Sequence, residues 1–397
     1  MKKLVLLALL AATASAATYA APGDDATDLH KRLLTLDTHL DTPIHFSRPG
    51  WNFGERHDHA TDPVQVDLGR MDAGNLDGGF FVIYTASGPL TPEGYAAAKA
   101  FALHRSDEIH ATLAKFSGRI GLATKASDAA RLDKAGKRFG FISIENSYPL
   151  GEDLSLLGEF YKRGVRMASP VHFKNNQFAD SATDTPKWNG LSPLGKRWVA
   201  EMNRLGMVLD ASHASDAVLD QMIELSKTPV ILSHSGSKAI FDHARNLDDA
   251  RLRKLAASGG AICANAAYLG KSNPNAERSE ISDKLEDAGK LGLSAEQVAT
   301  LTRRLREIEA TAPSQQADFE TYMRLVLHLI DVAGVDHVCF GADWDGGGGV
   351  PGFEDIDALP KVTARLRQAG YSATDIEKMW SGNVLRLLRI AEQRKGR

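Results

Sequence analysis

The sequence lacks both long apolar runs and an excess of charge of one sign. Lys and Arg total 47 against 50 Asp and Glu, so the net charge over 397 residues is −3. This balance gives no support for nucleic-acid binding. The apolar run Leu4–Leu10 is too short to span a membrane as a helix. No internal repeat or low-complexity tract stands out, and one domain with insertions accounts for the length.

Cysteine is also scarce. The chain has two, Cys263 and Cys339, and both lie inside apolar runs typical of strands. We expect two buried free thiols. A strained disulfide is the alternative, because bridging two strands places narrow demands on their geometry.

The first 20 residues have the pattern of an export signal, so the folded domain is expected at 21–397. The basic pair Lys2-Lys3 precedes the apolar run, and small residues allow cleavage after Ala16 or Ala20. Removing the two lysines takes the net charge from −3 to −5. No cysteine lies near either cleavage site and the C-terminal tail is basic, so no membrane anchor is expected. The mature chain is expected to be soluble and exported, most simply to a bacterial periplasm.

Eight apolar segments alternate with helical patterns along the chain. Most are apolar throughout, as parallel strands covered by helices should be. Eight such repeats predict an α/β fold, a (β/α)8 TIM-type barrel. The expected strands are 33–38, 79–84, 139–144, 164–168, 206–210, 229–233, 259–264 and 337–342. Helices are expected at Tyr95–Phe116, after the cap Ser192-Pro193, and after the cap Ser215.

Residues 270–316 break this alternation. A polar stretch is followed by the capping box Ser294–Gln297, which predicts a charged helix between strands seven and eight. The segment is either a solvated excursion or a functional lid or dimer contact, so a homodimer stays possible.

Candidate metal ligands follow four of the expected strands. In a barrel of this type, residues just past the strand ends converge on one mouth. Imidazoles and carboxylates gathered there are the ligands that a zinc hydrolase needs. A single such histidine is usually structural, but coincidence at four strand ends is far less probable. The candidates are His39, Asp41, Glu145, His213 and His234.

These ligands divide into two groups around Glu145. His39 and Asp41 are two positions apart on a strand end, so both side chains point to one side of the backbone. The two oxygens of Glu145 could bridge two cations, with His213 and His234 closing the second site. Asp37 is in phase with the first pair but deeper, in a supporting position.

A series of motifs, in order along nearly the whole mature chain, resembles the membrane (renal-type) dipeptidases, peptidase family M19 of the amidohydrolase superfamily. The matching stretches run from about Leu33 to Leu388. They are Asp37–Asp41, Gln65–Leu68, Gly164–Arg166, Ala179–Ser181, Gly190–Ser192, Glu201–Met207, Ser233–Ser235, His243–Asn246, Gly341–Gly346 and Gly382–Arg386.

The resemblance implies a binuclear zinc site and a dipeptidase reaction in which a metal-bridged hydroxide attacks the peptide carbonyl. It implies that Glu145 bridges the two ions. His172 would stabilise the oxyanion, and Asp343 would carry the proton to the leaving amine. Arg245 would bind the substrate's terminal carboxylate, for which a planar guanidinium is well suited. Zinc, cobalt and manganese can share such ligands.

The chain departs from the family pattern after strand seven. Many members have Asn-Phe-Tyr where this chain has Asn265-Ala266-Ala267, with Tyr268 one position late. The 270–316 insertion follows directly. Both features lie where substrate side chains would be read, so the preferred dipeptide stays open.

Other polar residues have simpler interpretations. His104 and His110 are expected to be solvated, and His57 and His59 to form a charged loop. The glycines of 346–349 lack the Lys-Ser/Thr of a phosphate loop. The alternative functions are a related amidohydrolase acting on N-acyl amino acids or lactams, and a non-catalytic binding protein on a decayed barrel.

Overall fold

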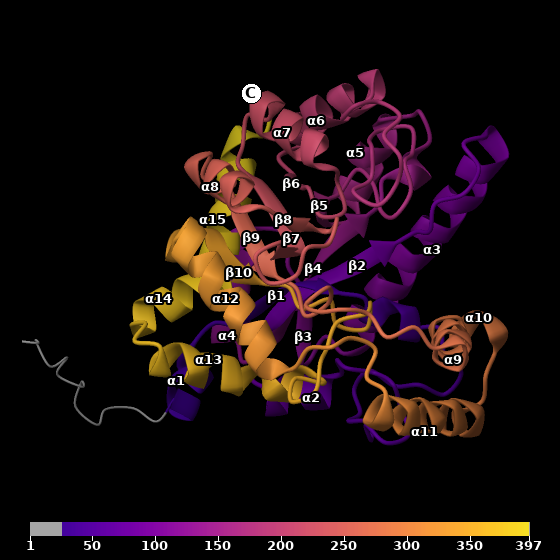
Figure 1. Cartoon of the computed structure of the whole chain (residues 1–397). Helices are drawn as coiled ribbons and strands as arrows, with labels where there is room; N and C mark the ends of the chain where they lie inside the picture. The colour runs from indigo at the N-terminus through magenta and orange to yellow at the C-terminus, as the bar shows by residue number, and fades with distance from the viewer. Residues whose placement is uncertain (1–25, 397) are drawn as a thin grey trace, which may run out of the picture.

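Eight parallel strands form a nearly closed barrel in the computed structural model, which describes residues 26–396 (Figure 1). The (β/α)8 prediction is therefore confirmed, and each expected strand is present with shifted ends. In barrel order the strands are β1 (Leu36–Leu40), β2 (Gly78–Tyr84), β4 (Arg138–Glu145), β5 (Val165–Ala168), β6 (Val208–Asp210), β7 (Val230–Ser237), β9 (Ala261–Ala264) and β10 (Val338–Phe340).

The barrel closes between its first and last strands just beyond β10. Leu40 forms a parallel bridge with Trp344, and the amide of Asp41 donates to the carbonyl of Trp344 at 2.9 Å. The segment that carries His39 and Asp41 is thereby held beside the segment that carries Asp343. Closure of the barrel therefore brings together two segments that are about 300 residues apart in the sequence.

Helices surround the strands and bury the apolar side chains on the outer face of the barrel. They are α1 (Ala26–Arg32), α2 (Leu68–Ala73), α3 (Pro92–Lys115), α4 (Ala126–Lys134), α5 (Ser155–Lys162), α6 (Pro193–Leu205), α7 (Asp216–Leu225), α8 (Asp249–Ala257), α12 (Phe319–Ala333), α13 (Leu359–Gln368), α14 (Ala373–Glu377) and α15 (Asn383–Arg394). No helix within residues 26–396 has the length and apolar character needed to cross a bilayer.

Local sequence signals set the helix ends. Ser192 and Ser215 accept hydrogen bonds from the amides of Gly195 and Val218, as N-caps should, so both expected caps are confirmed. Helix α6 ends at Gly206, whose φ of 74° is the left-handed conformation that glycine adopts without a steric penalty.

A second apolar cluster fills the inside of the barrel. Alternate residues of the strands face inward, so Phe139 and Phe141 of β4 share this cluster with Ala261 and Cys263 of β9. Side chains of α15 and α4 pack against the same cluster. The interior is a packed core, and polar side chains are left to gather at the strand ends.

The 270–316 insertion is helical, as expected, although the polar stretch before Ser294, where no helix was expected, also forms helices. It contains α9 (Ala276–Glu286), α10 (Ala288–Leu291) and α11 (Ala295–Thr311), which lie together at one side of the molecule (Figure 1). Ser294 and Gln297 form the expected capping box at the start of α11. The three helices share a small apolar cluster of their own, with Ile281, Val298 and Ile308 among its members.

Two short strands were not expected. Strand β3 (Ile120–Leu122) pairs with β4 off the barrel path, and β8 (Asn246–Leu247) pairs with the extended end of β7. Both are too short for a periodic signal in the sequence. Strand β8 matters for the site because it directly follows Arg245.

The expectation of two free thiols is wrong. Cys263 and Cys339 form a disulfide, with their Cα atoms 4.1 Å apart. The cause is strand register, because β9 and β10 pair these two residues directly and both are fully buried. Pairing of residues 76 positions apart could not be read from the sequence.

Replacing Cys263 and Cys339 together by Ala should lower the free energy of unfolding by about 2–5 kcal/mol, because the bond closes a long loop in the unfolded chain. Urea unfolding of the double variant and the unmutated protein measures the difference. Alkylation of the denatured, unreduced protein should find no free thiol. Two alkylated cysteines per chain would contradict the disulfide.

Candidate metal centre

All five candidate ligands lie in one buried cluster at the carboxyl ends of the strands. Strand β1 and its end supply two of them, and β4, the loop after β6, and β7 supply one each. Their exposed fractions range from 1% to 6%. The five residues are His39, Asp41, Glu145, His213 and His234.

Two imidazoles converge on one oxygen of Glu145. His213 Nε2 lies 3.0 Å and His234 Nε2 3.3 Å from Glu145 Oε1. The two imidazole nitrogens are themselves 2.9 Å apart. Three donor atoms in a triangle of this size match the ligand spacing around one cation with bonds of about 2.0–2.2 Å.

The other oxygen of Glu145 faces a second group. His39 Nε2 is 3.5 Å from Glu145 Oε2, 3.3 Å from Asp41 Oδ2 and 3.9 Å from Asp343 Oδ1. Glu145 thus directs one oxygen to each group of ligands. This division is the geometry that a bridging carboxylate requires.

Several buried polar atoms in the cluster have no hydrogen-bond partner. They are both ring nitrogens of His39, Oδ1 of Asp41 and Nδ1 of His213. Leaving one such atom unpaired costs about 1–3 kcal/mol, so a cluster of them would be unfavourable without a further ligand. Imidazole and carboxylate donors that converge in this way fit a divalent cation.

The pKa shifts of the cluster also indicate a site that favours a cation. Burial raises the pKa of Asp41 to about 7 and also raises that of Asp343, where Glu145 adds to the effect. Burial opposes protonation of His39, yet the carboxylates of Glu145 and Asp41 outweigh it and raise the pKa of His39 well above its usual range. Burial lowers the pKa of His213 and His234 far below the usual value, which keeps them neutral. Neutral imidazoles beside crowded carboxylates are a site that favours a cation.

The backbone is specialised at the ligands. His213 and Asp343 both have φ of 66°, a conformation that costs energy for residues with side chains. Gly346 packs against Asp41 and Asp343 so closely that a Cβ atom would collide with both carboxylates. Asp37 accepts hydrogen bonds from the amides of His39 and Ala342, so it supports the site from below, as expected.

His172 and Asp343 lie at the same mouth. His172 Nε2 is 3.8 Å from Glu145 Oε1, and burial lowers the pKa of His172 to about 4, so its ring is neutral at pH 7. Asp343 Oδ2 is 3.4 Å from Nδ2 of Asn265, a neighbour that we did not anticipate. Tyr84 was missed as well, and its ring packs edge-on to His172 with centroids 4.8 Å apart. Its position at the end of β2 was the available signal.

Arg245 is a buried cation that has no carboxylate partner among residues 26–396. It is 3% exposed, its Nη2 donates to the carbonyl of His234 at 3.1 Å, and its Nε has no partner. Its guanidinium lies 5.6 Å from the ring centre of Tyr268. Burial lowers the pKa of Arg245, although Tyr268 and Asp343 oppose this shift. Free donors on a buried guanidinium favour an anionic ligand.

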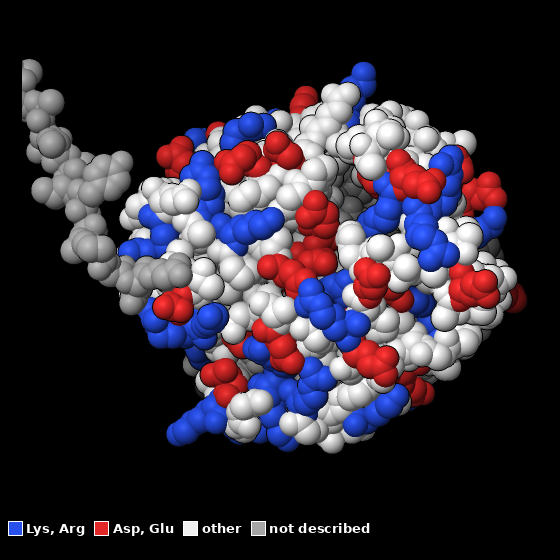
Figure 2. Space-filling view, turned by 90° about the horizontal axis from the view of Figure 1, so that it is seen from below, with Lys and Arg blue, Asp and Glu red and all other residues white. Residues whose placement is uncertain are grey.

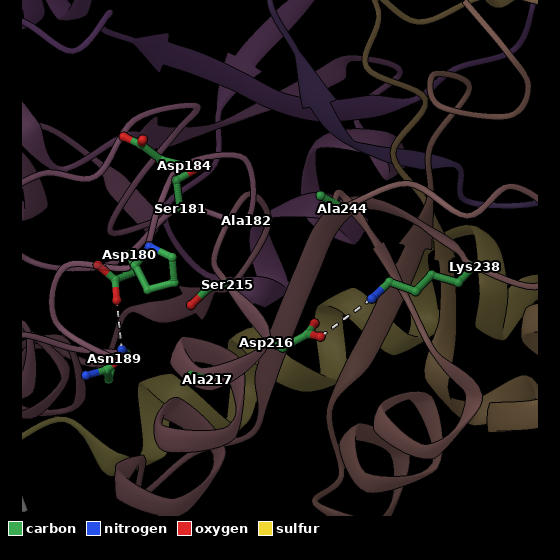
Figure 3. A pocket seen from close by; sticks show the side chains of 12 residues that line it. Asp180, Ser181, Ala182, Asp184, Asn189, Ser215, Asp216, Ala217, Lys238 and Ala244 are labelled. Carbon is green, nitrogen blue, oxygen red and sulfur yellow. Dashed lines mark hydrogen bonds and ion pairs between the residues drawn. The ribbon is translucent and has the colours of Figure 1, made fainter.

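A cavity of about 440 Å³ opens behind the loop that carries His213 (Figure 3). Asp216 and Lys238 face each other across it at 3.5 Å, and Ala244, next to Arg245, forms part of its wall. The amide of Ala182 in its lining donates to the carbonyl of His213 at 2.8 Å. None of the five candidate ligands lines this cavity.

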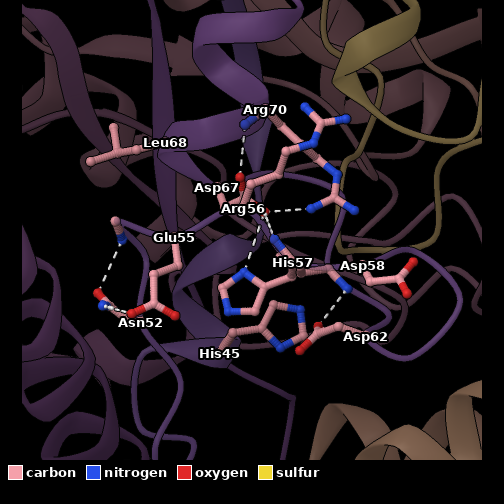
Figure 4. A network of polar contacts seen from close by, with 12 residues as sticks. His45, Asn52, Glu55, Arg56, His57, Asp58, Asp62, Asp67, Leu68 and Arg70 are labelled. Atoms are coloured by element: carbon pink, nitrogen blue, oxygen red, sulfur yellow. Dashed lines mark hydrogen bonds and ion pairs between the residues drawn. The ribbon is translucent and has the colours of Figure 1, made fainter.

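The remaining histidines serve other contacts. His57 pairs with Asp67 at 3.3 Å in a polar network beside the barrel (Figure 4), and neither it nor His59 belongs to a candidate metal group in the described chain. His104 is exposed, as expected. For His110 the expectation of a solvated side chain is wrong, because its Nε2 contacts the carbonyl of Arg163 at 2.7 Å. Basic and acidic side chains are interspersed on the face seen in Figure 2, without a broad patch of one sign.

The chain is similar to proteins of one known family. The family model described as membrane dipeptidase (Peptidase family M19) matches residues 24–397. A dipeptidase of Claviceps purpurea, tcpJ, is 30% identical over 334 residues, covering 82% of this chain and 69% of the relative.

Two solved structures are similar throughout. One is the probable dipeptidase PvdM from Pseudomonas aeruginosa, with a TM-score of 0.79 and 30% identity over 93% of this chain and 98% of that one. The other is a metallo peptidase from Rhodobacter sphaeroides, liganded with a phosphinate mimic of the dipeptide L-Ala-D-Ala. Its TM-score is 0.71, with 25% identity over 90% of this chain and 99% of that one.

Metal affinity should rise with pH across the neutral range. A cation at His39 and Asp41 must displace protons that the raised pKa of each group retains near pH 7. Each displaced proton makes affinity about tenfold higher per pH unit below the relevant pKa. Competition with a chelating dye at pH 6, 7 and 8 measures the slope. His57→Gln, a change away from the cluster, should keep the same slope, and an affinity independent of pH would contradict the prediction.

Proposed function

We propose that this chain, which belongs to the membrane dipeptidase family (peptidase family M19), is a zinc-dependent dipeptidase for substrates with a free C-terminal carboxylate. One observation carries the proposal: five buried side chains of types that can ligate a metal ion lie beside a buried arginine that forms no ion pair in the described chain. In a dipeptide, the peptide bond and the terminal carboxylate are close enough together for the first to reach the ligand cluster while the second contacts Arg245.

Two zinc ions per chain, bridged by Glu145, are the proposed cofactors. His39, Asp41 and Glu145 would hold one, and Glu145, His213 and His234 the other. When bound, such ions activate water at neutral pH and polarise the substrate carbonyl. Cobalt and manganese accept similar donors, so metal analysis must decide the identity.

Residues of the chain would position the substrate and move the proton. Arg245 binds the terminal carboxylate through its free guanidinium donors. His172, neutral and next to Glu145, donates a hydrogen bond to the developing oxyanion. Asp343 accepts a proton from the attacking water and delivers it to the leaving amine, which its raised pKa favours.

Export, most simply to the periplasm, completes the proposal. The signal with cleavage after Ala16 or Ala20 lies outside the described residues, 26–396. The Cys263–Cys339 disulfide supports export, because such bonds persist chiefly in oxidising compartments.

A related amidohydrolase acting on N-acyl amino acids or lactams is the second candidate. Those substrates also carry a carboxylate for Arg245, and the changed segment after β9 alters the substrate surroundings. Assays on dipeptides, their N-acetyl forms and lactams, with the same purified protein, separate the two functions. A non-catalytic binding protein is disfavoured, since every proposed ligand and Asp343 are present.

Glu145→Gln should reduce metal content from two ions toward one and lower the rate, because the amide keeps one neutral oxygen and loses the bridging charge. Plasma emission analysis of the purified mature protein gives the stoichiometry. A parent protein that saturates at one ion under metal-replete conditions would remove the bridging role.

Asp343→Asn should retain the metal ions and lower kcat by roughly two to four orders of magnitude, the range for loss of a general acid–base group. Metal analysis and steady-state kinetics on the same sample separate chemistry from binding. If kcat stays near that of the unmutated protein, another group moves the proton.

Arg245→Ala should leave the metal ions in place and cost about 2–4 kcal/mol in kcat/KM, the scale of a lost charge-assisted contact in a buried site. With the unmutated enzyme, amidating the dipeptide should lower kcat/KM by a similar amount. With the variant it should lower kcat/KM little further, because both changes delete the same interaction. Equal cleavage of free and amidated dipeptides would favour a broader amidohydrolase.

A further inference from the structure

Asp210, the last residue of β6, is a buried carboxyl group whose hydrogen-bond partners in the described part of the chain are all neutral donors. It is 3% exposed and forms no ion pair within residues 26–396. Its Oδ1 accepts hydrogen bonds from the amides of Ser212 and Ser233, both at 2.9 Å. Burying a carboxyl group is costly unless its oxygens are hydrogen-bonded, and here both oxygens of Asp210 accept hydrogen bonds.

The second oxygen of Asp210 fixes the orientation of one hydroxyl group. Ser233 Oγ donates to Asp210 Oδ2 at 2.6 Å. A hydroxyl group has one hydrogen, and Ser212 Oγ, at 3.4 Å, is a much longer alternative partner. Ser233 Oγ therefore has only lone pairs to offer its other neighbour.

That neighbour is the ring of His234. Ser233 Oγ lies 2.9 Å from His234 Nδ1, and since the hydroxyl can only accept there, Nδ1 carries the ring hydrogen. A neutral imidazole protonated at Nδ1 has its lone pair on Nε2. This Nε2 is the atom that faces Glu145 Oε1 and His213 Nε2.

The other two imidazole ligands have no comparable support. Nδ1 of His39 and Nδ1 of His213 are buried without a hydrogen-bond partner. His234 is thus the one candidate ligand in the described chain whose outer nitrogen is held. Fixing that nitrogen orients the ring and strengthens the metal-facing nitrogen as a donor.

We propose that Asp210 and Ser233 form a positioning relay that holds His234 in the Nδ1-protonated tautomer and so prepares the Glu145–His213–His234 site for its cation. The relay rests on the proposed function for its metal, but the tautomer is a property of the metal-free protein. Asp210 also ties together the segments before His213 and His234 through its Oδ1, so its replacement disturbs more than the relay.

Ser233→Ala is the sharper variant for this reason. It removes the hydroxyl while leaving both backbone contacts of Asp210 in place. We expect zinc at one of the two sites to bind about 10–100-fold more weakly, with the other ion retained. Excess zinc should restore activity, which it would not do for a misfolded or catalytically disabled protein. Asp210→Asn should weaken binding of the same ion. The double variant should bind it little more weakly than either single variant, because both changes break one relay.

Ser212→Ala is the matched control. Ser212 Oγ accepts from the backbone amide of His234 at 3.1 Å, so this change also deletes a serine hydrogen bond to the same residue but leaves the ring contact intact. Zinc affinity in this variant should stay within about threefold of the parent.

The direct measurement is NMR of ¹⁵N-histidine-labelled, metal-free protein, with His234 assigned by its loss in His234→Gln. The parent should show His234 protonated at Nδ1, and Ser233→Ala should mix the tautomers. An Nε2-protonated His234 in the parent, or unchanged zinc affinity in Ser233→Ala, would overturn the relay. Failure of the parent to bind zinc at all would instead remove the proposed function and leave the tautomer result to stand alone.

Discussion

The burial of Glu145 among four other ionisable candidate ligands is the constraint on which the site depends. Carboxylates and imidazoles at no more than 6% exposure are unfavourable unless a cation or hydrogen bonds compensate for their lost hydration. Neighbouring residues hold these buried groups in place. Asp37 accepts from the amide of His39, and Asp210 contacts the ring of His234 through Ser233. Gly346, which has no side chain, leaves room for the carboxylates. His213 and Asp343 also have positive φ, a conformation that costs energy for residues with side chains.

The barrel makes such a cluster possible because it separates packing from chemistry. Inward side chains of the strands and those of α15 fill the interior, so the core does not rely on the polar strand ends. The bridge between Leu40 and Trp344 joins the ends of the barrel, and β9 and β10 are linked by the Cys263–Cys339 disulfide. The bond therefore stiffens the last two strands, beyond which Asn265 and Asp343 meet.

The 270–316 insertion lies beside the turn that follows Asp41 but has an apolar core of its own. Helix α10 contacts the 3₁₀ turn Thr42–His45, which directly follows Asp41, and Arg306 of α11 donates to the carbonyl of His59 at 3.3 Å. Its small apolar cluster is separate from the two clusters of the barrel. Changes in this segment can therefore reshape the surroundings of the mouth without altering the candidate metal ligands.

The sequence alone determined the barrel, the helical insertion, the capped helix starts and the strand-end position of each candidate ligand. These features follow from apolar runs, capping residues and the convergence of parallel strand ends, which are all local patterns or direct consequences of one fold class. The roles given to His172, Arg245 and Asp343 came from family resemblance, since no local pattern distinguishes Arg245 from other arginines. The tertiary structure alone decided the Cys263–Cys339 pairing, the contact of Asn265 with Asp343, the approach of Tyr84 to His172 and the relay from Asp210. Each depends on strand register and on contacts between segments far apart in the chain, where a shift of one residue would turn the side chain to the opposite face.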